Sequence, residues 1–380
     1  MGKIDNILEY NKVDFTNKKV FIRCDFNCPL DKDGNITDDF RIKSSLVTLK
    51  FIINNNPKML VILTHMGRPT SSDKNINSKL STSKLVSILS KELKINVNFI
   101  KEGLDYNYNN IDKGVYLSEN VRFHTYETLN TDLRNKIFEK NEVSLSSFDI
   151  DVFCNEAFSV SHRDHFTVTG LKCNLKCYGH CFLKELRSFD KIMYPDEKSN
   201  TLAIIGGSKV SDKIPMLENL SKKVDYIFIA GNNVNSYRKD PNMLDKFKNN
   251  KAKIIIMEDG FGGSDPKESP QYFPNTESLN SEQMLFDIGP ISMNKLIKII
   301  DQVNVIFWNG ALGISEHQFY KNGSEMLLKY MNCNKSLNVI IGGGDTAGFV
   351  KNYNNDFYHI STGGGAAIEY IGNESLPALE

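Results

Sequence analysis

The sequence predicts an α/β protein with two Rossmann-like parallel-sheet domains that are joined by a helix. Three observations support this prediction. The chain has 380 residues, which is enough for two domains of ordinary size. Short apolar runs recur at a spacing of roughly 25–50 residues, which leaves room for the crossover helices of βαβ units. Polar residues or glycines follow these runs, at the strand ends where open α/β sheets bind their ligands.

The predicted strands are continuous apolar runs, as expected when helices cover both faces of a parallel sheet. In the first half they are VFIRCDF (20–26), MLVILTH (59–65), VYLSEN (115–120) and DVFCNEA (151–157). In the second half they are TLAIIGG (201–207), YIFIAG (226–231), KIIIMED (253–259), VIFWNG (305–310) and NVIIGGG (338–344). Each half is therefore predicted to form one open sheet.

A helix is predicted between the two halves, over residues 178–198. Its apolar residues recur at helical spacing, and Pro195 with the charged residues after it ends the pattern. The periodic positions are Phe182, Leu186, Phe189 and Ile192. This helix divides the chain into a first domain over 1–177 and a second domain over 199–365.

Two segments do not follow the strand-and-helix pattern. Residues 259–284 are rich in Gly, Ser, Pro and Asn, so they are predicted to form an irregular loop. Cys173, Cys177 and Cys181, with His180 among them, could place metal ligands along one helix face. The same cysteines also fit three small buried thiols near a linker, because zinc sites usually use C-x2-C pairs.

Composition excludes several classes of protein. Lys+Arg and Asp+Glu both number 46, so the net charge is zero and nucleic acid is not an expected partner. No apolar run is long enough to cross a membrane, and the N-terminus lacks the apolar core of a signal peptide. The seven cysteines are an odd number, which favours reduced thiols. The expected location is the cytoplasm, without membrane association.

Cationic residues follow the strands of the first half. An arginine fork binds phosphate or carboxylate with two hydrogen bonds, although a single arginine is more often part of a surface ion pair. Several such residues at the ends of successive parallel strands are expected to converge on one small anionic molecule. They are Arg23, Arg41, His65, Arg68, Arg122, His162 and Arg163.

Glycine-rich turns occur in the second half. IIGGSKVSDK (204–213) carries Lys209 and Lys213, VIIGGGDTAG (339–348) carries the acid Asp345, and HISTGGGAA (359–367) is a third turn. Such turns allow backbone N–H groups and helix N-termini to bind phosphates, although none matches the P-loop or dinucleotide fingerprints. The second half is therefore predicted to bind a nucleotide, and phosphoryl transfer between the two halves follows as a hypothesis.

These motifs, taken in order, resemble those of phosphoglycerate kinases over nearly the whole chain. The matching segments are RCDFNCPLDKDGNITDDFRI (23–42), LTHMGRP (63–69), LSENVRF (117–123), NEAFSVSHRDH (155–165), GGSKVSDKI (206–214), DIGP (287–290), FWNGALGISE (307–316), IGGGDTA (341–347) and HISTGGGA (359–366). The resemblance implies two lobes that close about a hinge and transfer a phosphoryl group between 1,3-bisphosphoglycerate and Mg-ADP. The products are 3-phosphoglycerate and Mg-ATP.

The resemblance also assigns roles to residues of the first half. The substrate-binding positions are Asp25, Asn27, Arg41, His65, Arg68, Arg122 and Arg163. Asp25 and Asn27 are expected to orient the hydroxyl and carboxyl end of phosphoglycerate. The remote phosphate is assigned to His65, Arg68, Arg122 and Arg163. Arg41, together with Lys209 of the second half, is expected to neutralise charge on the transferring phosphoryl group.

In the second half the resemblance implies a site for ADP or ATP with Mg²⁺. Lys213 is expected to hold nucleotide phosphate, Asp345 to hold Mg²⁺ and Glu316 to contact the ribose. Gly343, Gly344 and Thr346 are expected near the phosphates, and Gly363, Gly364 and Gly365 form the turn that approaches the phosphoryl group on closure. The resemblance further implies a monomer whose C-terminal tail, residues 366–380, packs back on the first domain.

Departures from the family pattern collect on the base side of the nucleotide site. The family's GGGMA reads AGNNV (230–234), its WNGP reads WNGA with Ala311, and its NDAF reads NEAF with Glu156. The segment before DIGP is short and divergent. Two alternatives follow: a catalytically weak homologue that acts as a binding or regulatory protein, or an active enzyme with altered nucleotide preference that uses guanosine or inosine nucleotides.

Overall fold

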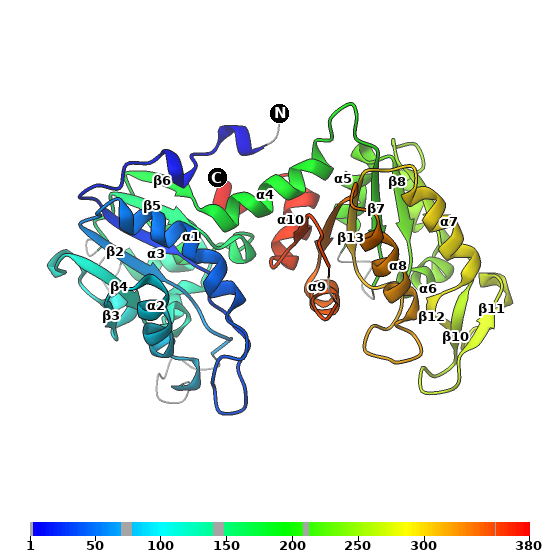
Figure 1. The fold of residues 1–380 in the computed structure, drawn as a ribbon, viewed down its shortest axis with the longest axis horizontal. Coiled ribbons are helices and arrows are strands. Elements are labelled where there is room, and N and C mark those ends of the chain that lie inside the picture. Colours follow the sequence, from blue (N-terminus) through cyan, green and yellow to red (C-terminus); the bar gives the residue numbers. More distant parts are fainter. Residues whose placement is uncertain (1–2, 70–77, 140–147, 208–212, 354) are drawn as a thin grey trace. The chain divides into compact units, whose positions relative to one another are not determined.

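Two separate parallel sheets organise the chain, which the computed structural model describes over residues 3–69, 78–139, 148–207, 213–353 and 355–380. Each sheet belongs to its own unit (Figure 1). The N-terminal unit comprises Ile4–Lys184 with Leu376–Glu380, and the C-terminal unit is mainly Glu185–Ser375. This confirms the predicted class of two parallel-sheet α/β domains.

The sheet of the N-terminal unit has six parallel strands in the order β3-β4-β2-β1-β5-β6. The strands are β1 (Lys19–Arg23), β2 (Met59–Leu63), β3 (Val97–Ile100), β4 (Gly114–Ser118), β5 (Val152–Asn155) and β6 (Leu175–Tyr178). Three helices accompany them, namely α1 (Phe40–Asn54), α2 (Leu85–Leu93) and α3 (Thr131–Glu139). Neighbouring strands run in the same direction, so their carboxyl ends meet at one edge.

Strand β1 shows why these strands are apolar throughout. Val20 and Ile22 belong to one hydrophobic cluster, whereas Phe21 belongs to a second cluster on the opposite face. Successive side chains of a strand point to opposite faces, so a sheet with two covered faces needs apolar residues at every position. The continuous apolar runs in the sequence are therefore a direct consequence of burial on both faces.

The sheet of the C-terminal unit also has six parallel strands, in the order β15-β14-β13-β7-β8-β9. The strands are β7 (Thr201–Ile205), β8 (Tyr226–Ile229), β9 (Lys253–Ile256), β13 (Val305–Asn309), β14 (Asn338–Gly342) and β15 (His359–Ile360). The helices of this unit are α5 (Ile214–Lys223), α6 (Asn232–Lys239), α7 (Pro290–Ile300), α8 (Asn322–Cys333), α9 (Gly344–Lys351) and α10 (Gly364–Asn373).

The segment predicted as an irregular loop, residues 259–284, instead contains strands, and this prediction was wrong. β10 (Gly260–Gly263) pairs antiparallel with β11 (Gln271–Phe273) and with β12 (Met284–Ile288). Glycine has low strand propensity, so local sequence gave no signal for β10. The glycines are needed because the strands approach closely: a Cβ at Gly262 would overlap the carbonyl oxygen of Met284.

The cysteine pattern of 173–181 does not lie on one helix. Cys173 precedes β6, Cys177 lies within β6, and Cys181 lies in the first turn of α4 (His180–Met193). Within the described ranges, no group of three or more His, Cys, Asp or Glu side chains could hold a metal ion. These findings disfavour the metal interpretation of the cluster. In the same ranges, no helix is both long enough and apolar enough to cross a membrane.

Boundaries between the units differ from those expected. α4 ends at Met193, and the chain passes from one unit to the other within it, after Lys184. Residues 366–380 were expected to pack on the first domain, but only Leu376–Glu380 belong to the N-terminal unit. α10 stays in the C-terminal unit because its buried side chains, among them Tyr370 and Ile371, pack there.

The last residues are held in the N-terminal unit by hydrogen bonds to the backbone of Ala378. The hydroxyl of Tyr178 donates to the carbonyl oxygen of Ala378 at 2.7 Å, and the N–H of Ala378 donates to the carbonyl oxygen of Ser161 at 3.2 Å. Leu376 and Ala378 are fully buried. The return of the chain therefore begins about ten residues later than residue 366, because α10 intervenes.

Candidate functional site

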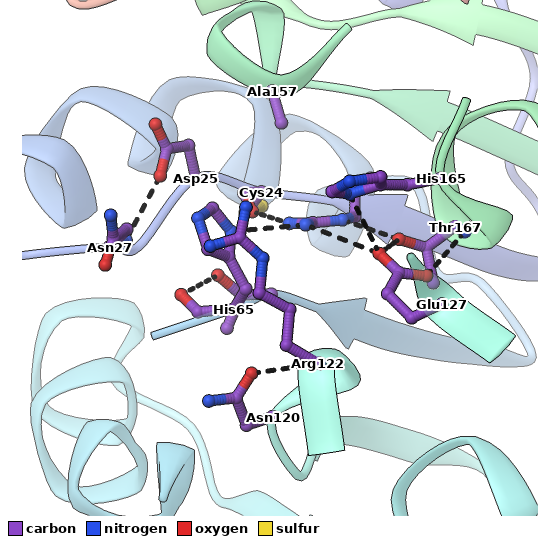
Figure 2. Close-up of polar contacts among 12 residues, drawn as sticks. Cys24, Asp25, Asn27, His65, Asn120, Arg122, Glu127, Ala157, His165 and Thr167 are labelled. Atoms are coloured by element: carbon purple, nitrogen blue, oxygen red, sulfur yellow. Dashed lines mark hydrogen bonds and ion pairs between the residues drawn. The ribbon is translucent and has the colours of Figure 1, made fainter. Parts of the chain in front are cut away.

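The cationic residues of the N-terminal unit gather at the carboxyl edge of its sheet. Arg23 ends β1, His65 follows β2, and Arg122 lies in the short 3-10 helix Val121–Phe123 after β4. His162, Arg163 and His165 follow β5. We call Arg23, His65, Arg122, His162, Arg163 and His165 the basic cluster; Figure 2 shows His65, Arg122 and His165 within one region beside Asp25 and Asn27.

Hydrogen bonds hold this edge in place. The amide oxygen of Asn27 accepts the N–H of Gly67 at 2.7 Å, and the Arg122 guanidinium donates to the Gly67 carbonyl oxygen at 2.7 Å. Gly67 has a φ of +62°, and a Cβ there would lie 2.7 Å from Leu80 Cδ2, so a larger residue would strain this loop. Residues that follow β1 and β4 therefore hold the loop after β2 in place.

Asp25 forms the polar side of the site, next to the basic cluster. One of its carboxylate oxygens makes an ion pair with Arg41 and accepts the hydroxyl of Ser159, and the other accepts the N–H of Asn27 at 3.1 Å. Arg41 lies in the first turn of α1 and remains partly exposed. Sequence reasoning missed Ser159, since a lone serine in the short 3-10 helix Phe158–Val160 carries no signal.

Asn120 is a second residue of the site, one to which sequence reasoning gave no role. Its amide nitrogen donates to the carbonyl oxygens of Met66 and Leu80 at 2.8 and 2.9 Å, and its amide oxygen accepts the N–H of Arg122 at 3.1 Å. This buried side chain therefore couples the loop after β2 to the turn that carries Arg122; Figure 2 shows its contact with Arg122. Arg68, in contrast, is exposed.

Positive charge dominates the basic cluster. Burial, followed by Arg23 and Arg163, lowers the pKa of Arg122 to about 10. Burial is also the main cause that lowers the pKa of His162 to about 4 and that of His165 to about 3, with neighbouring arginines adding to it. His165 Nδ1 lies 3.7 Å from Glu127 Oε1, which is too far for a hydrogen bond. Because the imidazole is neutral, the two side chains also form no ion pair.

Several buried nitrogens of the basic cluster lack hydrogen-bond partners in the described part of the chain. They are Arg122 Nε, His162 Nδ1 and His165 Nδ1. A buried polar group without a partner costs free energy, so a site that keeps such groups is suited to an added ligand. With arginines around them, these nitrogens favour an anionic ligand such as a phosphate.

The C-terminal unit has a glycine-lined pocket of about 640 Å³ at the carboxyl ends of β7, β13 and β14. Most residues predicted for the nucleotide line it: Lys213, Glu316, Gly343, Gly344, Asp345, Thr346, Gly364 and Gly365. Gly363 precedes α10 and is not among the lining residues. Lys209 lies outside the described residues.

Glycines shape the floor of this pocket. Gly310 has a φ of +95°, and a Cβ there would overlap the carbonyl group of Gly206. Gly343 precedes α9 with a φ of +86°, whereas a Cβ at Gly344 would meet no atom within 4 Å. The first turn of α9 therefore presents backbone N–H groups to open space, as phosphate-binding helix N-termini do.

Polar side chains complete the pocket around these glycines. Lys213 is buried, and its ammonium donates to the Gly206 carbonyl oxygen at 2.6 Å. Thr346 Oγ1 accepts the N–H of Gly310 at 2.8 Å, while the buried amide nitrogen of Asn309 has no partner in the described ranges. Asp345 is exposed in the first turn of α9. One carboxylate beside a phosphate-sized cradle fits Mg²⁺, which is usually held by one or two carboxylates plus substrate phosphates.

The opposite wall of the pocket is mainly apolar, with Met284, Leu285, Phe286, Ala311 and Ile314. Asn232, one of the departures from the family pattern, also lines it. The neighbouring Asn233 is buried, and its amide nitrogen donates to the Gly206 carbonyl oxygen at 2.9 Å. The substitutions at 230–234 therefore alter both the wall and the support of the pocket.

Comparisons with known proteins agree with this arrangement. The family model described as phosphoglycerate kinase matches residues 10–242 and 236–374. Phosphoglycerate kinases of Wolbachia pipientis subsp. Culex pipiens and of Dictyostelium discoideum are each 32% identical, with 98% and 100% of this chain and 98% of each relative covered. Solved phosphoglycerate kinase structures from Coxiella burnetii and Pyrococcus horikoshii superpose with TM-scores of 0.83 and 0.75, at 27% and 25% identity and 98% coverage of both chains.

Proposed function

Because this chain belongs to the phosphoglycerate kinase family, we propose that it transfers a phosphoryl group reversibly between 1,3-bisphosphoglycerate and Mg-ADP. The products are 3-phosphoglycerate and Mg-ATP. Phosphoglycerate binds the N-terminal unit, and the nucleotide binds the C-terminal unit. The observation that carries this proposal is the basic cluster, in which Arg122 Nε, His162 Nδ1 and His165 Nδ1 are buried without hydrogen-bond partners among the described residues.

The chemistry needs little beyond positioning and charge neutralisation. An oxygen of the ADP β-phosphate attacks the acyl phosphorus, and the bond from phosphorus to the carboxyl oxygen breaks to release a carboxylate. A carboxylate leaves, or attacks in the reverse direction, without a general acid or base. Arg41 and Lys209 neutralise charge on the transferring group, and the turn at Gly364 and Gly365 lies beside it.

The remaining residues bind and orient the substrates. His65, Arg68, Arg122 and Arg163 hold the remote phosphate of phosphoglycerate, while Asp25 and Asn27 orient its hydroxyl and carboxyl end. Lys213, Gly343, Gly344 and Thr346 receive the nucleotide phosphates, and Glu316 receives the ribose. Mg²⁺, when bound at Asp345, offsets the charge of those phosphates. Both substrates must meet, so the proposal includes the hinge closure that the family resemblance implies.

A coupled assay tests the activity. It combines 3-phosphoglycerate, Mg-ATP, NADH and excess glyceraldehyde-3-phosphate dehydrogenase. NADH consumption that requires every component supports the kinase. No activity from folded protein with ATP, GTP or ITP would instead indicate a homologue that only binds or regulates. Equal turnover with GTP or ITP would indicate altered nucleotide preference, for which Asn232 in the pocket wall is the first candidate.

Location and assembly complete the proposal. We place the enzyme in the cytoplasm as a monomer whose partners are small-molecule substrates only. These points rest on the family resemblance and on the neutral composition of the chain. Sedimentation at micromolar concentration tests the monomer, and a mass twice that of the 43.1 kDa chain would contradict it.

Replacing Gly344 with valine is expected to weaken nucleotide binding at least about tenfold, because the isopropyl group fills space beside the α9 N-terminus. Folding should be unaffected, since a Cβ at Gly344 meets no atom within 4 Å. Gly348→Val is the matched control: it lies in the same helix with equally open surroundings but does not line the pocket. Calorimetric titration with Mg-ATP measures both; equal affinities would refute the assignment of phosphates to this turn.

Replacing Asp345 with asparagine is expected to raise the Mg²⁺ concentration for half-maximal activity at least about tenfold, since one of few anionic ligands is lost. The measurement is a Mg²⁺ titration at saturating nucleotide and phosphoglycerate. Asp356→Asn serves as control, because the Asp356 side chain is 83% exposed and, within the described ranges, forms an ion pair only with Lys335, at 3.5 Å. An unchanged midpoint for Asp345→Asn would show that this carboxylate does not hold the metal.

A further inference from the structure

Arg23 is a fully buried arginine at the centre of the basic cluster, and its guanidinium has a fixed set of partners. Its Nε donates to Thr167 Oγ1 at 2.8 Å, and one terminal nitrogen donates to the Cys24 carbonyl oxygen at 2.6 Å. The other terminal nitrogen lies 3.2 Å from His65 Nδ1. Because guanidinium nitrogens only donate, each of these contacts has one possible direction.

Thr167 connects Arg23 to Glu127. Its Oγ1 accepts from Arg23 Nε with one lone pair. The hydroxyl proton is donated to Glu127 Oε1 at 2.8 Å. The N–H of Thr167 donates to Glu127 Oε2 at 2.9 Å. Both oxygens of the buried Glu127 thus accept, as those of a carboxylate do, and Glu127 Oε1 lies 4.0 Å from Arg23.

The contact with His65 determines which nitrogen of its imidazole carries the proton. Arg23 donates, so His65 Nδ1 must be the acceptor and cannot carry a proton. The proton of a neutral imidazole is then on Nε2. Within the described ranges no residue hydrogen-bonds to Nε2, which leaves that N–H available to a ligand.

We propose that Glu127 and Thr167 are positioning residues that hold Arg23 so that His65 stays neutral and presents its Nε2–H to the remote phosphate of phosphoglycerate. This inference deepens the proposed function and rests on it. His65 then binds the phosphate as a hydrogen-bond donor, and the arginines supply the positive charge. Phosphate binding at His65 would not require the imidazole to gain a proton.

The charges around His65 agree with a neutral ring. Burial lowers the pKa of His65 well below its ordinary value, and Arg23, Arg122, Arg41 and His165 add to the effect in that order. Glu127 is the carboxylate of the same network, and burial raises its own pKa, against which Arg23 and Thr167 act. A positive charge on His65 would lie among these arginines, and their repulsion disfavours protonation of the ring.

Nitrogen-15 NMR of histidine-labelled protein tests the tautomer without any substrate. We expect His65, assigned with His65→Gln, to show a protonated Nε2 and a bare Nδ1 from pH 6 to pH 8. Thr167→Val removes the hydroxyl that orients Arg23 and should shift His65 towards a mixture of tautomers. Thr169→Val, in the same short helix Phe166–Gly170, is the control and should leave the His65 signals unchanged. A protonated Nδ1, or titration of His65 between pH 6 and 8, would overturn the proposal.

Binding of 3-phosphoglycerate, measured by calorimetry, tests the donor role even if a Thr167 variant does not fold. The side-chain amide nitrogen of glutamine can reach the position of His65 Nε2 and donate in its place. The amide nitrogen of asparagine reaches only the position of Nδ1. We therefore expect His65→Asn to bind at least about tenfold more weakly than His65→Gln. Equal affinities would overturn the donor role. If the coupled assay fails while the NMR result holds, the proposed activity fails but the tautomer assignment stands.

Discussion

Arg41→Ala is expected to lower kcat at least about a hundredfold, because it removes the guanidinium that is proposed to neutralise negative charge on the transferring phosphoryl group. The KM for phosphoglycerate should change much less, since the interaction is made chiefly in the transition state. Arg41 lies in the first turn of α1 and pairs with Asp25, another residue of the proposed phosphoglycerate site. The coupled assay at saturating substrates measures the loss.

Two further variants separate the effect of the Arg41 charge on catalysis from the effect of losing its ion pair with Asp25. Asp25→Asn removes the ion pair while Arg41 remains, so it should affect phosphoglycerate binding more than kcat if Arg41 acts on the phosphoryl group directly. Lys43→Ala is the matched control, because Lys43 lies two residues along the same helix in an exposed pair with Asp39. Near-normal kcat for Arg41→Ala, or an equal kcat loss in Asp25→Asn, would contradict the assigned role.

The wild-type free energy of unfolding is expected to fall by roughly 2–3 kcal/mol between pH 5 and pH 7 through Glu156, and Glu156→Gln should remove this fall. Glu156 is buried at the end of β5; its Oε1 accepts the N–H of Cys181 at 3.2 Å. Its Oε2 has no hydrogen-bond partner in the described ranges. A Cβ at Gly179 would overlap this oxygen, so the carboxyl packs directly against Gly179.

The sign of this pH dependence follows from the pKa of Glu156. Burial raises it from 4.5 to about 8, so the folded state holds a proton that the unfolded state releases. The stabilising contribution is therefore complete below about pH 4.5 and is lost as pH rises towards 8. Asp287, whose pKa burial raises to about 7, changes stability in the same direction within the other unit.

Denaturant unfolding of wild type and Glu156→Gln at pH 5, 6 and 7 measures this effect. Glu282→Gln is the control for loss of one exposed carboxylate. Glutamine keeps the shape of the side chain without an ionisable group, so the variant should be the more stable protein at pH 7. Parallel pH profiles for wild type and Glu156→Gln would show that Glu156 does not titrate in this range.

Much of the fold could be predicted because it depends on local patterns. A parallel strand such as β1 is buried on both faces, and that requirement appears in the sequence as a continuous apolar run. β10 shows the limit of this reasoning. Its glycines form a strand only because the partner strands β11 and β12 lie beside it, and nothing local encodes their approach.

The candidate site divides in the same way. Motif and position at strand ends were enough to select Asp25, His65, Arg122 and Asp345 from the sequence, because parallel strands bring their carboxyl ends to one edge. The roles of these residues remain proposals for the assays above. The orientation of the cationic side chains, and the residues that support them, could not be selected in this way.

By itself, the sequence determined the family, the two parallel sheets, and the sheet edge at which the cationic residues and the glycine-rich turns lie. All three depend on the order of motifs along the chain. Only the tertiary structure decided how the cations are held. Arg23 and Thr167 are 144 residues apart, and Glu127 and Thr167 are 40 apart, yet they form one buried network. Hydrogen-bond direction depends on which atoms meet in space, and that is settled when the sheet assembles.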